Sequence, residues 1–124
     1  MAIIGAHMLM YTSEAEKLRA TFRDVFGFKS VDAGRGWLIF ALPPSELGIH
    51  PSEGHGAPRG THEISFMCDD IHSTIAELRE KGIEIEGEPK DEGFGVRTTM
   101  ILPGGVRVLL YEPRHAMAIA PEKR

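Results

Sequence analysis

Four polar residues with metal-binding or acid–base chemistry stand near the ends of strand-like runs. His7 opens the run HMLMYT, Glu63 opens EISFMC, His50 follows LGI, and Tyr111 lies near the end of LLYEP. Two imidazoles and one carboxylate suit one divalent ion of Fe, Mn, Zn or Ni. Three protein ligands leave positions open for water, oxygen or a substrate, as in catalytic metal sites. We therefore expect His7, His50 and Glu63 to bind a metal, with Tyr111 as an acid, a hydrogen-bond donor, a fourth ligand or a packing residue.

Taken singly, these residues also have ordinary structural interpretations. A strand histidine is most often hydrogen-bonded in the core or at a sheet edge, and Glu63 alone could be a solvated strand end. An internal repeat is what groups them. The distance from His7 to Glu14 equals that from Glu63 to Asp70, seven residues in each half, so the polar residues fall at related places in the two halves.

Each half of the repeat has the pattern of one strand, one helix and three further strands. In the first half we expect a strand over residues 3–12 and a helix beginning at Ser13, because Ser13 and Glu16 have the spacing of a capping box. Gly27 is a suitable helix end. Three strands are then expected over residues 28–32, 37–41 and 47–50.

The second half repeats this order with stronger signals. A strand is expected over residues 63–68, followed by a helix capped by Asp70 that ends at Gly82. The apolar stripe of that helix consists of Ile71, Ile75 and Leu78. The remaining strands are expected over residues 83–86, 96–102 and 106–112, with Gly104 and Gly105 forming a hairpin turn.

A half of roughly fifty residues cannot bury its apolar face alone, so the two halves must pack or pair. We predict one α+β domain over residues 1–124, built from two tandem βαβββ modules that form a curved mixed β-sheet cup. The modules cover residues 1–51 and 61–113, separated by a linker over 52–60 and followed by a tail over 114–124. His55 in the Gly- and Pro-rich linker is interpreted as a solvated loop residue.

Strand alternation assigns side chains to faces of the expected sheet. Val106, Val108 and Leu110 form an apolar set that should pack under a helix, which leaves Tyr111 on the opposite face. The same parity directs His7, His50 and Glu63 into the cup. His62 and Glu112 would point away from it, although a single bulge would reverse a strand and put either of them in place of an assigned ligand.

Composition limits the classes of partner and compartment. The net charge of −4 argues against a nucleic-acid partner. No apolar stretch approaches the roughly 20 residues of a membrane span, and the N-terminus lacks the basic region of a secretory signal. Cys68, the single cysteine, excludes an internal disulfide and fits a reducing cytoplasm. Its apolar strand favours a buried, inert thiol.

With these elements in place, the sequence resembles the vicinal oxygen chelate superfamily, which includes glyoxalase I, extradiol dioxygenases, and fosfomycin- and bleomycin-resistance proteins. The matching segments are HMLMYTSEAEKLRATFRDVFGF, HEISFMCDDIHSTIAELREKG and LPGGVRVLLYEP. The resemblance implies two βαβββ modules that form a cup of strands around a metal, usually in a homodimer. It also places ligands on the first and last strands of each module.

The expected ligands match this family pattern only in part. His7 and Glu63 match the two first-strand positions, but His50 lies two residues beyond the common last-strand site, which is Gly48. The usual glutamate position in the second module is Leu109. The resemblance implies that glyoxalase I activity needs carboxylates at both last-strand positions. This chain lacks them, so a glyoxalase-like activity fits it poorly.

The resemblance implies a small metal-dependent enzyme that acts on a small molecule chelating the metal through neighbouring oxygens. A set of two histidines and one carboxylate is similar to that of extradiol dioxygenases, so ring-opening dioxygenation is the first expectation, and isomerase or lyase chemistry follows. The alternative is a protein of the same fold that binds an antibiotic or another small molecule without turnover. Fold alone does not distinguish these functions.

Overall fold

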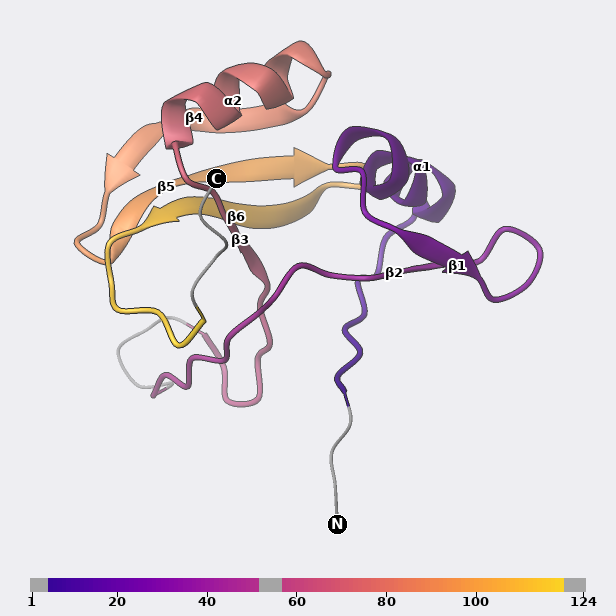
Figure 1. The fold of residues 1–124 in the computed structure, drawn as a ribbon, viewed down its shortest axis with the longest axis horizontal. Helices are drawn as coiled ribbons and strands as arrows, with labels where there is room; N and C mark the ends of the chain where they lie inside the picture. The colour runs from indigo at the N-terminus through magenta and orange to yellow at the C-terminus, as the bar shows by residue number, and fades with distance from the viewer. Residues whose placement is uncertain (1–4, 52–56, 120–124) are drawn as a thin grey trace.

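The structure, a computed structural model, describes residues 5–51 and 57–119. Its elements are α1 (Ala15–Ala20), η1 (Thr21–Val25), β1 (Ser30–Asp32), β2 (Leu38–Phe40), β3 (Ser65–Met67), α2 (Ile71–Glu80), β4 (Glu84–Asp91), β5 (Gly95–Leu102) and β6 (Val106–Pro113). The predicted α+β class and the curved mixed sheet are confirmed (Figure 1). None of the helices in the described ranges has the length and apolar character needed to span a bilayer.

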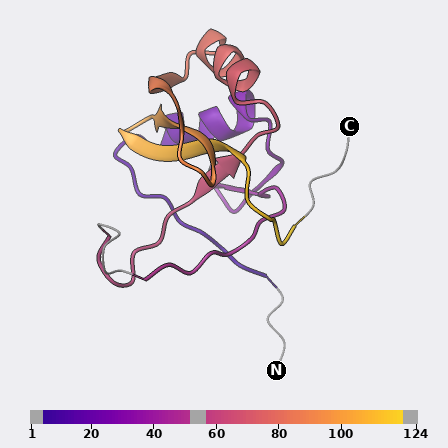
Figure 2. The same cartoon turned by 90° about the vertical axis from the view of Figure 1, so that its left-hand side faces the viewer.

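The second half forms a complete βαβββ unit. Its sheet has the order β3-β6-β5-β4, with β3 parallel to β6 and the other neighbours antiparallel. In Figures 1 and 2, α2 lies on one side of this sheet, while residues 42–51 and 57–62 lie on the other side. The sheet therefore has one face covered by a helix and one face directed toward the segments that flank the linker.

Helix α2 forms where the sequence predicts it. The Asp70 carboxylate accepts a hydrogen bond from the Ser73 amide at 3.2 Å, which satisfies one of the free N–H groups of the first turn. The predicted stripe of Ile71, Ile75 and Leu78 is buried against the sheet. Gly82, with a φ of 87°, ends the helix in a conformation that favours glycine.

The first half differs from its prediction at both ends. The expected strands over 3–12 and 47–50 are not strands in the described residues, and only the β1–β2 hairpin is paired. A strand needs a neighbour to hydrogen-bond with, and the single chain brings none to these segments. The helix also begins later than expected, at Ala15, and Glu14 at its N-cap makes no side-chain cap, so the predicted Ser13–Glu16 capping box is wrong.

An aromatic cluster packs the first half onto the second. Its five rings, with centroid separations from 5.0 to 6.1 Å, are those of Phe22, Phe26, Phe28, Phe40 and Phe66. Phe66 lies on β3, whereas the other four belong to the first half. Edge-to-face contacts such as Phe28–Phe66 add to the free energy gained from burial.

A polar contact joins the two halves at the β5–β6 turn. The Gly104 amide donates to the Glu14 carboxylate at 2.6 Å, and the Thr12 hydroxyl donates to the Pro103 carbonyl at 3.0 Å. Lys17 first, and the Gly104 amide second, lower the pKa of Glu14. Glu14 is thus used for docking the first helix onto this turn, and not for capping that helix.

Candidate functional site

The predicted parity of β6 is confirmed. Val108 and Leu110 are buried in the core under the helices, and Val106 packs against that core. Leu109 and Tyr111 therefore project from the opposite face, which we call the open face. Leu109 stands in register with Ser65 of β3 and Thr99 of β5, and Tyr111 stands with Met67 and Arg97.

Tyr111 is the buried polar side chain of the open face, with 7% of its surface exposed. Its hydroxyl lies 2.9 Å from Nε2 of His115, and the two rings stack with centroids 5.8 Å apart. Phe94 contacts the same phenol ring edge-on at 5.6 Å. Gly95 allows this packing, because a Cβ there would lie 3.0 Å from Cδ2 of Tyr111.

The charge beside this phenol comes from Glu46. Burial first, and the negative charge of Glu46 second, raise the pKa of Tyr111, so the phenol is neutral at ordinary pH. The Glu46 carboxylate accepts from the amides of Ala118 and Ile119 at 2.8 and 3.4 Å. The segment before the linker and the C-terminal tail therefore meet next to Tyr111.

Two ion pairs lie beside the open face. Arg107 binds both oxygens of Glu86 at 2.6 Å, and this hydrogen bonding lowers the pKa of Glu86. Arg97, across from Tyr111, pairs with Glu92 at 3.2 Å. Both pairs are substantially solvated, and they neutralise charge next to the cup more than they stabilise the fold.

The residues predicted to bind a metal lie outside the sheet. His7, His50 and Glu63 are all exposed, on segments without strand structure. Within residues 5–51 and 57–119, no three His, Cys, Asp or Glu side chains are grouped so that they could hold a metal ion. The divalent metal that the sequence predicts is therefore not matched by a donor set among the described residues of one chain.

The two alternative ligands have different outcomes. Glu112 points to the helix side, as the parity predicts, and its carboxylate accepts from the Ile71 amide at 3.0 Å. It thus caps α2 from 41 residues away in the sequence. His62 is exposed, and His55 lies outside the described residues.

Sequence reasoning did not identify His115, Glu46 or Phe94 as site residues. His115 lies in a tail without periodicity, and Glu46 reaches Tyr111 through tertiary structure alone. One local signal was available: His115 follows Tyr111 by four residues, directly after Pro113 and Arg114. Proline has no backbone N–H to donate to a neighbouring strand, so Pro113 marks the end of the strand and of the alternation by which the sequence could place side chains.

Cys68 contacts the same strand from the helix side, where its thiol lies 3.7 Å from the Tyr111 carbonyl. Burial raises the pKa of Cys68 to about 11 from an ordinary value of 9.0. The thiolate is the reactive form. Cys68 is thus only partly buried, where a buried thiol was expected, and its raised pKa agrees with the expected inertness.

We expect iodoacetamide to alkylate Cys68 at pH 8 about 100-fold more slowly than an ordinary cysteine, because the raised pKa reduces the thiolate fraction by about that factor. The rate should increase with pH up to about 11. Mass spectrometry of timed samples measures it, with the urea-unfolded protein as control. Rapid alkylation of the folded protein at pH 8 would contradict the assignment.

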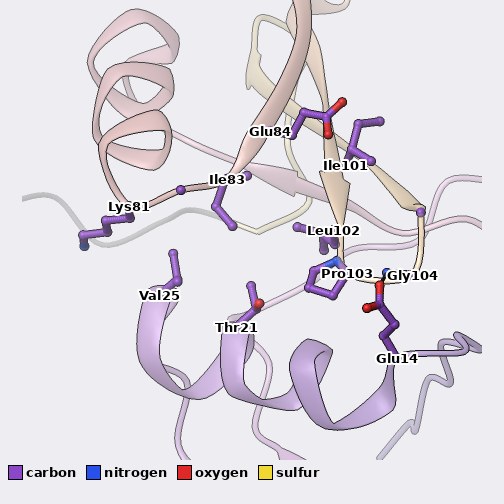
Figure 3. A pocket seen from close by; sticks show the side chains of 12 residues that line it. Glu14, Thr21, Val25, Lys81, Ile83, Glu84, Ile101, Leu102, Pro103 and Gly104 are labelled. Atoms are coloured by element: carbon purple, nitrogen blue, oxygen red, sulfur yellow. Dashed lines mark hydrogen bonds between the residues drawn. The ribbon is translucent and has the colours of Figure 1, made fainter.

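A separate pocket of about 490 Å³ lies where the two halves meet (Figure 3). Glu14, Thr21 and Val25 line it from the first helix, and Lys81 and Pro103 from the second half. Its lining contains neither histidine nor cysteine. The pocket therefore belongs to the junction between the halves and not to the Tyr111 site.

Comparisons with known proteins agree with this architecture. The chain is similar to the antibiotic-binding protein TnmS3 from Streptomyces sp. CB03234, with 23% identity and a TM-score of 0.64 over 91% of this chain and 98% of that one. It is also similar to a lactoylglutathione lyase from Agrobacterium tumefaciens, with 19% identity and a TM-score of 0.59 over 90% and 92% of the two chains. A third similar structure is an integron cassette protein from V. cholerae, with 16% identity and a TM-score of 0.56 over 90% and 97%. At these identities the likeness concerns the fold.

A search of curated protein sequences gives no match. A family model does match: the one described as the Glyoxalase/Bleomycin resistance protein/Dioxygenase superfamily covers residues 5–116. That match covers nearly all of the chain, including both halves of the repeat and the Tyr111 strand. The chain therefore belongs to the Glyoxalase/Bleomycin resistance protein/Dioxygenase superfamily.

Proposed function

We propose that the protein binds a small, largely apolar molecule on the open face of the sheet, in a cup completed by a second copy of the chain. The observation that carries this proposal is the Tyr111 site itself. A neutral phenol, held between Phe94 and His115, stands in register with the apolar side chain of Met67. Apolar walls with a few placed polar groups are the usual composition of a small-molecule site.

The need for a second copy follows from where apolar side chains are exposed. Nine of the ten exposed large apolar side chains in the described residues belong to the first half, and Phe94 is the tenth. The nine are Met8, Leu9, Tyr11, Val31, Trp37, Ile39, Leu42, Leu47 and Ile49. The concentration of these side chains in one half supports an interaction face there.

The open edge of the sheet supports the same assembly. Strand β3 is at one end of the order β3-β6-β5-β4, so its outer edge has no neighbour in that sheet. Proteins normally cover or pair such an edge. Residues 5–12 have no strand partner within one chain, so the same segment of a second chain is suited to pair with this edge, and a two-fold dimer is the commonest symmetric solution.

Native mass spectrometry of the freshly purified protein tests this function, because one measurement reads the assembly, any bound organic molecule and any metal. A dimer that binds small apolar molecules without needing a metal supports the proposal. A monomer that binds none of them under the same conditions contradicts it. Tyr111→Phe, which keeps the ring but removes the hydroxyl, then tests the position of the site.

The metal-dependent enzyme remains a second candidate. It is favoured by the location of His7, His50 and Glu63 on exposed segments that adjoin the proposed contact between two chains. Two copies of the chain can bring together donors that one copy keeps apart. Ring-opening dioxygenation, isomerisation and lyase chemistry all depend on that metal, and they remain predictions.

If this candidate is correct, the dimer should bind about one Fe, Mn, Zn or Ni ion per chain, and His7→Ala or His50→Ala should abolish that binding. Glu63→Ala should do the same, whereas His62→Ala and His55→Ala should leave it unchanged. Metal analysis of dialysed protein measures the stoichiometry. Full metal retention in the His7 and His50 variants would exclude this ligand set.

A further inference from the structure

The hydrogen bonds around His115 have a single consistent direction. Nδ1 of His115 lies 2.8 Å from the carbonyl oxygen of Ala116, and a carbonyl only accepts, so Nδ1 carries a proton. In a neutral imidazole Nε2 is then the acceptor. The Tyr111 hydroxyl, 2.9 Å from that nitrogen, must therefore donate its one proton to His115.

This direction determines what Tyr111 offers to a bound molecule. Its proton is committed to His115, so the phenol oxygen presents only lone pairs to other partners. The neighbouring carboxylate of Glu46 makes the surroundings unfavourable for an anion. Phe94, with 42% of its surface exposed, provides an apolar contact next to the phenol.

We propose that His115 is a positioning residue that fixes Tyr111 as a hydrogen-bond acceptor, so that the site selects neutral molecules with an apolar body and a hydroxyl or N–H donor. The ligand class rests on the proposed small-molecule site, whereas the direction of the Tyr111–His115 bond does not depend on it. The two parts are therefore tested separately.

The tautomer of His115 is the first test. In protein labelled with ¹⁵N-histidine, the ring-nitrogen shifts should show a proton on Nδ1 and none on Nε2, with the signal assigned by its loss in His115→Gln. Tyr111→Phe should remove the hydroxyl partner and let the second tautomer appear, while His72→Gln, at an exposed position on α2, should leave the His115 signals unchanged. A proton on Nε2 in the unchanged protein would overturn the proposal.

The second test compares phenol with anisole, because both have the same ring but anisole has no donor. By ligand-observed NMR, phenol should bind about fivefold more tightly than anisole, which is the typical effect of one neutral hydrogen bond. Tyr111→Phe should remove this preference, and His115→Phe, which keeps a stacking ring, should reduce it. A preference for anisole would overturn the ligand class. Binding of neither probe would refute the small-molecule site, with the tautomer result still standing.

Discussion

Gly104→Ala should destabilise the protein by about 3 kcal/mol, whereas Gly105→Ala should cost only about 1 kcal/mol. Both glycines have positive φ, 83° and 74°, so the backbone strain of an alanine is similar at the two positions. They differ in their surroundings. A Cβ at Gly104 would overlap the Thr12 hydroxyl, while a Cβ at Gly105 meets nothing within 4 Å.

The extra cost at Gly104 arises at the contact between the two halves. Moving Thr12 away breaks its hydrogen bond to Pro103 and disturbs the bond from the Gly104 amide to Glu14. Urea midpoints, with the slope checked for constancy, measure the difference between the two variants. Equal losses for both would mean that the overlap relaxes freely and that this contact does not hold the halves together.

The second half was predictable because each of its elements is determined by several local signals that agree. Helix α2 has a cap at Asp70, an apolar stripe and a glycine end, and the structure places all three as expected. The faces of β6 followed from alternation, since a slip by one residue would move Val108 out of the core. Consistency among local signals is what makes such an element specific.

The first half was less predictable because its apolar pattern depends on a neighbour that the pattern does not identify. Residues 5–12 alternate like a strand, yet they remain unpaired when only one chain is present. The Ser13–Glu16 motif was wrong for a related reason: Thr12 accepts from the Glu14 amide, and Glu14 binds Gly104. A hydrogen bond between residues 90 positions apart in the sequence outweighed a local capping motif.

The residues of the candidate site were likewise predictable only in part. Tyr111 was identifiable because strand parity alone places it on the open face. His115 and Glu46 were not, because their positions depend on how the tail and the segment before the linker come together. Whether His7, His50 and Glu63 share a site depends on a still larger contact, the proposed one between two chains.

We expect Leu47→Lys combined with Ile49→Lys to dissociate the proposed dimer. The two side chains are 84% and 86% exposed in one chain, so neither substitution removes a contact from the folded monomer's core. Burying each at an interface would contribute about 1.5–3 kcal/mol. Their loss, together with the cost of burying two ammonium groups, should raise the dimer Kd by at least about 100-fold.

Sedimentation equilibrium over a range of concentrations measures this Kd, and circular dichroism confirms that the variant chain stays folded. Ala76→Lys is the control for an added lysine, because it places the same charged side chain at an exposed position on α2, on the opposite side of the sheet from residues 42–51 (Figure 1). It should leave the dimer intact. If the double variant remains as dimeric as Ala76→Lys, residues 47–49 lie outside the interface. That result would exclude a cup completed by residues 47–49 of a partner, and with it a metal site that combines His50 with a partner's donors.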